Sequence, residues 1–333
     1  MTIRRRIGTT WLVCGLATLI VCLCAPLIGS TPISLNRVFD SSIPFADNTD
    51  AQIFFVARLP RVLAGALVGS ALAASGVVFQ ALLRNPLATP FTLGVSAGAA
   101  LGAILVLSFN LPSGLAGVSA VPIASFAGAL GALAIVYALA RVRHRGLSTN
   151  VLLLAGVTLN SFFSALILFV QFLADYTETF RTVRWLMGDL DVSSYRPLIA
   201  SLPPLALAFG AFAFLPRSLN LLSVSDESAA SRGVDVHRTQ RTAFLSASLA
   251  TGAAVSLGGP VGFIGIVVPH LIRLLVGADH RLVLPASTLA GAGFLVACDT
   301  VARTALAPLE IPVGVITAIL GGPFFLWLLV RNR

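Results

Sequence analysis

The residues of this 333-residue sequence that could bind a charged ligand or partner are mostly arginines. Lys and Arg together number 22, and no Lys occurs anywhere, so every one of these cations is an Arg. A P-loop needs a Lys against the nucleotide phosphates, and Schiff-base chemistry needs a Lys amine. The sequence therefore excludes a standard P-loop ATP site and a Schiff-base lysine.

Arg58, Arg61 and Arg303 lie at the ends of apolar stretches. A guanidinium can bind a carboxylate through two hydrogen bonds, and it keeps its charge at physiological pH. These arginines could therefore bind acidic groups of a partner. The alternative is that they anchor the chain to lipid headgroups.

Other groups with catalytic potential are sparse. Asp299 precedes Arg303 by four residues, which indicates a local ion pair, and Glu310 lies near the end of another apolar stretch. His270 is interpreted as a structural histidine or a functional gate. An HExxH motif does not occur, and acidic residues avoid the centres of the apolar stretches, which disfavours a zinc-dependent enzyme and an ion-coupled carrier. We therefore expect the driving energy to come from a separate subunit.

Cysteines give no indication of a metal site. Cys14, Cys22 and Cys24 lie in the first apolar stretch and Cys298 in a late one, without metal-ligand spacing in a polar loop. We expect no cofactor and no metal ion bound by this chain.

The elements that position these residues are predicted to be membrane-spanning helices. The sequence is 57% apolar and only 11% charged, whereas a soluble domain is roughly a quarter charged. This excludes a soluble enzyme and a nucleic-acid-binding domain despite the net charge of +9. The apolar stretches are continuous and about 20 residues long, as helices that cross a bilayer require. We predict one polytopic domain over 1–333 with ten spans: 11–29, 60–83, 91–109, 121–140, 149–173, 197–215, 240–258, 261–276, 284–302 and 312–330.

The arginines also predict the orientation of the chain. With ten spans and a cytoplasmic N-terminus, 15 arginines fall on the inside and seven on the outside, in agreement with the positive-inside rule. Arg4-Arg5-Arg6 could flank a signal peptide, but the many later spans favour an uncleaved first helix. Both termini are therefore predicted to be cytoplasmic.

The longest predicted cytoplasmic connection, 216–239, contains signals for a short helix. Ser225 can cap it, Asp226 and Glu227 fall in its first turn, and Arg232 and Gly233 mark its end. The pattern favours an ordered helix that docks a cytoplasmic partner, with a solvated loop as the alternative.

Glycine and proline mark packing and interruptions. Gly65 with Gly69, and Gly94 with Gly98 and Gly102, form rows that allow neighbouring helices to approach closely. The third and eighth spans are short and interrupted by Gly and Pro, and they lie five spans apart. Interrupted segments at corresponding places in two halves are typical of inverted-repeat transporters.

Short motifs in both halves of the chain resemble one known family. The first half contains Arg58-Leu59-Pro60-Arg61, 69–76, Gln80, 84–88 and 93–99. The second half contains 262–265, Pro269-His270, Arg273, 279–281, 284–285, Asp299, Ala302-Arg303, 310–314 and 321–325. Over nearly its whole length the sequence resembles the FecCD-type, BtuC-like permeases, the membrane subunits of ABC importers for iron–siderophores, haem and vitamin B12.

The resemblance implies an all-α membrane protein with ten transmembrane helices, in the type II ABC importer permease fold with inverted-repeat halves. It implies import of an iron–siderophore, with vitamin B12 or haem as the alternative within the family. A secondary carrier is the alternative from another class. The chain is expected to be no enzyme, since ATP and Mg would bind two separate ATPase subunits.

The resemblance also implies the surroundings of the chain. The expected partners are a periplasmic or extracellular substrate-binding protein, a second permease subunit and membrane lipid, without nucleic acid. The two permease subunits are expected to form a homodimer, with a heterodimer of homologous subunits as the alternative. The expected location is the bacterial cytoplasmic (inner) membrane, as a multi-pass protein.

Three sets of site residues follow from the resemblance. Arg58, Arg61 and Arg303 correspond to the family's docking pocket for the binding protein, and the helix near Ser225–Gly233 corresponds to its ATPase coupling helix. Ser148, Thr149 and Asn150 correspond to its cytoplasmic gate, although Ser148 could equally be a helix cap, and Asn150 departs from the small or hydroxyl residue common there.

Overall fold

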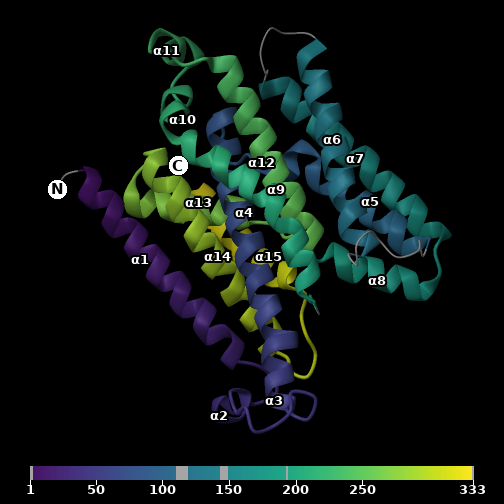
Figure 1. The fold of residues 1–333 in the computed structure, drawn as a ribbon. Coiled ribbons are helices and arrows are strands. Elements are labelled where there is room, and N and C mark those ends of the chain that lie inside the picture. The colour runs from purple at the N-terminus through teal and green to yellow at the C-terminus, as the bar shows by residue number, and fades with distance from the viewer. Residues whose placement is uncertain (1–2, 110–118, 143–148, 193, 332–333) are drawn as a thin grey trace.

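All regular elements in the part of the chain that the structure describes are helices (Figure 1). The computed structural model describes residues 3–109, 119–142, 149–192 and 194–331. The long helices are α1 (Ile3–Cys24), α4 (Leu59–Leu83), α5 (Val95–Ser108), α6 (Ala120–Val142), α7 (Thr149–Leu173), α9 (Tyr195–Phe214), α12 (Val236–Gly258), α13 (Ile264–Val276), α14 (His280–Thr304) and α15 (Val313–Arg331). The shorter ones are α2 (Leu35–Val38), α3 (Thr49–Gln52), a π-helical segment (Ile53–Arg58), α8 (Tyr176–Leu186), α10 (Pro216–Leu222) and α11 (Asp226–Ser231), with 3-10 turns at Ala25–Leu27 and Pro90–Leu93.

The length and composition of these helices agree with a multi-pass membrane protein. Among the described residues, six stretches are long and apolar enough to cross a bilayer: Arg6–Leu27, Thr49–Leu83, Ala120–Ala140, Asn150–Leu173, Tyr195–Phe214 and His280–Thr304. Three shorter apolar helices are Val95–Ser108, Ile264–Val276 and Val313–Leu328. Each of the ten predicted spans overlaps one long helix, and the number that cross the membrane stays a prediction.

Helix α4 runs between two opposite ends of the molecule (Figure 1). The first end carries α2 and α3, and we call it the arginine end because Arg58, Arg61 and Arg303 lie there. The second carries α10 and α11, and we call it the α11 end. Helix α1 lies along one side, and α5, α6 and α7 lie on the other.

Close packing around α4 depends on glycines. Gly69 lies against the backbone carbonyl group of Gly291 on α14, and Gly76 lies against the carbonyl group of Gly265 on α13. On the other side of the molecule, Gly98 of α5 lies against α6, where a Cβ would come within 2.6 Å of the carbonyl oxygen of Gly128. These glycine contacts agree with the rows expected from the sequence.

Two predicted spans begin later in the structure than the sequence pattern indicated. The third, predicted at 91–109, becomes helix only at Val95, because Pro90–Leu93 forms a separate 3-10 turn and Gly94 then turns the chain with a φ of 78°. The eighth, predicted at 261–276, becomes helix only at Ile264. Phe263 immediately before it has a φ of 66°, a left-handed conformation that is unusual for a residue other than glycine.

Candidate docking and coupling sites

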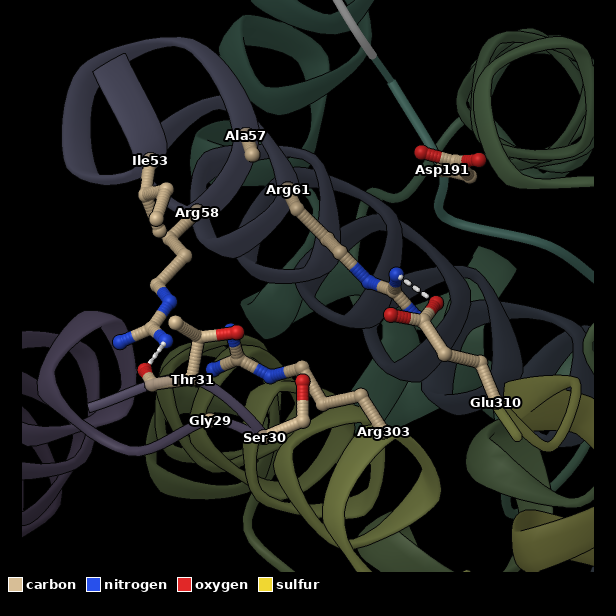
Figure 2. A pocket seen from close by; sticks show the side chains of 10 residues that line it. All are labelled: Gly29, Ser30, Thr31, Ile53, Ala57, Arg58, Arg61, Asp191, Arg303 and Glu310. Carbon is tan, nitrogen blue, oxygen red and sulfur yellow. Dashed lines mark hydrogen bonds and ion pairs between the residues drawn. The ribbon is translucent and has the colours of Figure 1, made fainter. Parts of the chain in front are cut away.

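The structure brings Arg58, Arg61 and Arg303 together around one pocket of about 180 Å³ at the arginine end (Figure 2). Arg58 closes the π-helical segment, Arg61 lies in the first turn of α4, and Arg303 lies in the last turn of α14. All three are buried, at 5–7% exposure. The remaining pocket residues are Gly29, Ser30, Thr31, Ile53, Ala57, Asp191 and Glu310.

Arg61 already has carboxylate partners within the chain. Its Nε donates to both carboxylate oxygens of Asp299 at 3.0 Å, and its Nη1 donates to Glu310 Oε2 at 2.6 Å. The side chain of Asp299 is 2% exposed, whereas that of Glu310 is 41% exposed. A buried charge is costly unless it is paired and hydrogen-bonded, so we interpret Arg61 and Asp299 as mutually dependent.

The hydrogen bonds of Arg303 and Arg58 go to uncharged oxygens. Arg303 lies 3.9 Å from Asp299, which gives the local ion pair expected from the sequence, and it donates to the carbonyl of Ala25. Arg58 donates to the carbonyls of Pro26, at 3.0 Å, and Thr31. No carboxylate pairs with Arg58 among the residues that the structure describes. Figure 2 shows Arg58 beside the chain at Thr31, while Arg61 points toward Glu310.

These contacts show which of the three arginines is most available to bind a carboxylate of a partner. A partner's carboxylate gains most from a guanidinium whose charge is not yet offset, and Arg58 is the clearest such group. Arg61 serves first to join α4 to α14 and to the chain that precedes α15. Because the pocket is small and the arginines are buried, an acidic side chain would have to enter it rather than lie flat on a surface.

At the α11 end, the predicted short helix is present. Ser225 caps it by accepting a hydrogen bond from the Ser228 amide at 2.9 Å, and Gly233 follows its end with a φ of 80°. Arg232 is the C-cap residue rather than part of the last turn. Helix α11 covers Asp226–Ser231, slightly shorter than the two turns expected.

The two acidic residues of α11 differ in their surroundings. Asp226 pairs with Arg84 at the end of α4, and Gln240 of α12 donates to it at 3.4 Å. Arg84 also donates through Nε to the carbonyl of Leu222 at 2.8 Å. Glu227 is exposed. Asp226 therefore connects α11 to α4 and α12, while Glu227 is free to face a partner.

Helix α10, which precedes α11, is held at the start of α14. Asn220 donates to Asp279 at 2.8 Å and accepts from the His280 amide at 2.8 Å. Asp279 caps α14, and the hydrogen bond from Arg281 is the main reason that the pKa of its carboxyl group lies well below the usual range. The α10–α11 segment is thus tied to both α4 and α14.

The predicted gate is only partly visible. Ser148 lies outside the described residues, Thr149 is the first residue of α7, and Asn150 is exposed in its first turn. No contact of Asn150 is described that would favour either the gate or the cap.

One buried polar contact was not recognised from the sequence as a unit. Gln80 of α4 donates to the carbonyl of Gly265 at 2.8 Å and accepts from Arg273 of α13. All three residues lie in motifs that resemble the family, so the sequence marked them as residues of interest. It could not predict that Gln80 contacts the other two, because Gln80 lies on a different helix. His270 lies nearby in sequence, with its ring 6.1 Å from that of Phe324. Within the described residues, no group of His, Cys, Asp or Glu could hold a metal ion.

The long apolar helices define a multi-pass helical membrane protein. Residues 17–331 match the model of the FecCD transport family, and the chain belongs to that family.

The relatives agree with this assignment. The chain is 40% identical over 312 residues to the hemin transport system permease protein HmuU of Yersinia pestis, covering 92% of this chain and 90% of that protein. It is 43% identical over 302 residues to the cobalamin import system permease protein BtuC of Halobacterium salinarum, covering 90% and 79%. A solved inward-facing structure of a metal-chelate type ABC transporter matches with a TM-score of 0.80 and 32% identity, covering 98% and 99%. The expected family and all-helical permease fold are confirmed.

Proposed function

We propose that this chain carries an iron–siderophore complex across the bacterial cytoplasmic membrane, as the permease subunit of a binding-protein-dependent importer. The observation that carries the proposal is the pair of polar sites at opposite ends of α4. A buried arginine pocket suited to carboxylates lies at one end, and a capped helix with an exposed acidic residue lies at the other.

The arginine pocket is the proposed docking site of an extracytoplasmic substrate-binding protein. Arg58 and Arg303 offer guanidinium groups bonded mainly to neutral carbonyls. A carboxylate of the binding protein would offset their charge, and opposite charges would also set the orientation of the complex.

Helix α11 is the proposed contact with two separate ATPase subunits, which bind ATP and Mg. The sequence lacks the Lys that a P-loop requires, which supports the absence of an ATP site on this chain. Both termini then lie in the cytoplasm with α11. Thr149 and Asn150 belong, with Ser148, to the proposed cytoplasmic gate. A second identical permease subunit completes the proposed translocation path for the cargo.

The nature of the cargo rests on the relatives. One is a hemin transport system permease, and hemin is an iron chelate. The matching solved structure is of the metal-chelate type, and both support an iron chelate here. The cobalamin relative supports vitamin B12 as the second candidate.

The test is uptake by proteoliposomes that contain the permease, its ATPase and its binding protein. Ferric siderophores, hemin and cobalamin would be offered singly, with and without ATP. ATP-dependent uptake of a ferric siderophore supports the proposal, and uptake of cobalamin or hemin alone would replace it. Uptake that persists without the ATPase subunit would indicate a secondary carrier instead.

A further inference from the structure

A second cavity, which shares no lining residue with the arginine pocket, lies between α6, α9 and α12. Its volume is about 420 Å³, within the roughly 300–1,000 Å³ of typical ligand sites. Small residues form its floor: Ala253 is 1% exposed and Ser201 is 6% exposed. Phe126 and Leu249 line it, and Ile123 and Leu207 at its rim are exposed at 38% and 70%. It is therefore an open groove with a floor of small side chains.

The chemistry of the groove suits a hydrocarbon chain. Both hydroxyl groups in its lining are already used within their own helices. Ser201 donates to the carbonyl of Leu198 at 2.7 Å, and Ser256 donates to that of Ala253 at 2.9 Å. Prolines and aliphatic residues make up most of the remaining lining. The side chains of the groove thus offer few free hydrogen-bonding groups to a polar ligand.

The groove lies in the half of the molecule nearer the arginine end. Tyr195 at the start of α9 donates to the carbonyl of Phe55, which precedes α4 at that end. The lining residues occupy the beginning of α6, the stretch Pro197–Leu207 of α9 and the last turns of α12. We therefore expect the groove to open within one leaflet.

A cation, Arg196, precedes the groove residue Ala200 by one turn of α9. Arg196, Ala200, Pro203 and Leu207 follow one another at helical spacings of four, three and four residues, so they share one stripe of α9. Helical side chains tilt toward the N-terminus, which directs Arg196 toward the membrane surface. Arg196 is exposed, and no carboxylate pairs with it among the described residues.

We propose that this groove binds one phospholipid of the leaflet at the arginine end. One acyl chain fills the groove between α6, α9 and α12, and Arg196 binds the anionic headgroup. The combination of an apolar groove of limited volume with an unpaired cation one turn of α9 before it distinguishes it from the general lipid-facing surface.

The test uses the purified full-length permease in nanodiscs of phosphatidylglycerol and phosphatidylcholine, followed by native mass spectrometry. Ala200→Phe and Ser256→Phe fill the groove from two different helices, at lining positions that are exposed and partly buried. Ala206→Phe is the matched control, because Ala206 is exposed on α9 but does not line the groove. Arg196→Gln removes the cation, and Arg181→Gln removes an exposed arginine of α8 as its control.

We expect the wild type and Ala206→Phe to retain one phospholipid per subunit, and both groove variants to lose it at unchanged thermal stability. Arg196→Gln should abolish the preference for phosphatidylglycerol, and Arg181→Gln should keep it. Equal retention by the groove variants and Ala206→Phe would overturn the site, as would equal headgroup preference in the two arginine variants. Disulfide formation between two copies carrying Leu207→Cys would show that a second chain covers the groove, which also overturns the proposal.

Discussion

The guanidinium of Arg61 on α4 donates through Nε to both carboxylate oxygens of Asp299 on α14, at 3.0 Å each, across a separation of 238 residues. The pair is almost completely buried, with side-chain exposures of 8% and 2%. It fixes the start of α4 against the end of α14 and so determines where the arginine pocket lies.

Breaking this pair should destabilise the protein. Asp299→Asn or Arg61→Gln leaves one buried charge without its partner, which costs about 3–5 kcal/mol. Glu310→Gln should cost only about 0–1 kcal/mol, because Glu310 is more exposed and solvent screens its contact. Thermal unfolding of the purified variants measures the difference. Equal losses for Asp299→Asn and Glu310→Gln would show that the buried pair has no special role.

Gly69→Ala should also destabilise the fold. A Cβ at position 69 would overlap the carbonyl group of Gly291 and lie 2.8 Å from Leu295 Cβ, so α4 and α14 would have to move apart. We expect a loss of about 1–3 kcal/mol, as for other overpacked cores. Gly210→Ala is the control, since nothing lies within 4 Å of a Cβ there. Similar thermal stability of the two variants would contradict the close contact.

Arg58→Gln should weaken binding of the substrate-binding protein by about 2 kcal/mol or more, because a desolvated carboxylate would lose its partner. Arg58→Lys keeps the charge and should retain part of the affinity. Arg37→Gln, which removes an exposed arginine of α2 at the same end, should have little effect. Affinity would be measured at low salt. Equal effects of Arg58→Gln and Arg37→Gln would return Arg58 to the role of a headgroup anchor.

Glu227→Arg should lower the ATPase rate that the binding protein stimulates, without changing thermal stability, since Glu227 is exposed on α11. Asp226→Asn should lower the same rate by a different route, because it breaks the contact with Arg84. Ser223→Arg adds an arginine outside α11 and is the control. A normal stimulated rate in Glu227→Arg would contradict the contact between α11 and the ATPase.

A cysteine at position 150 should react with a small thiol reagent at a rate that depends on the nucleotide state. The experiment requires a background without the four native cysteines, and Leu12→Cys, exposed on α1, supplies the control. The physical reason is that a gate residue is alternately covered and open. A labelling rate that does not depend on the nucleotide state would contradict the gate role and leave Asn150 a structural residue at the start of α7.

The sequence predicted the helical class because apolar stretches of about 20 residues have few other structures available in a bilayer. It also predicted the cap of α11, since Ser225 and its following acids form a local pattern. The pairing of Asp299 with Arg61 could not be predicted, because residues on distant helices meet only through tertiary packing. Local spacing revealed Arg303 alone as a partner of Asp299.

The segments 30–56 and 174–196 were not assigned elements from the sequence, yet they contain α2, α3 and α8. Helix α8 covers only Tyr176–Leu186. A search for apolar stretches long enough to cross a membrane does not find a helix of this length. Its Trp185 and Leu186 pack against Ile104 of α5 and Ile167 of α7, among others. Its amphipathic pattern was the available signal.

Because 20 of the 25 residues of α4 are buried by other parts of the chain, this helix has almost no contact with lipid. By contrast, only 11% of the apolar window of α1 is buried. The amide hydrogens of α4 should consequently exchange with deuterium equally slowly in detergent and in a bilayer, while α1 should respond to the change of solvent. Helix α4 thus supplies an internal standard that reports whether solubilisation has preserved the native interior.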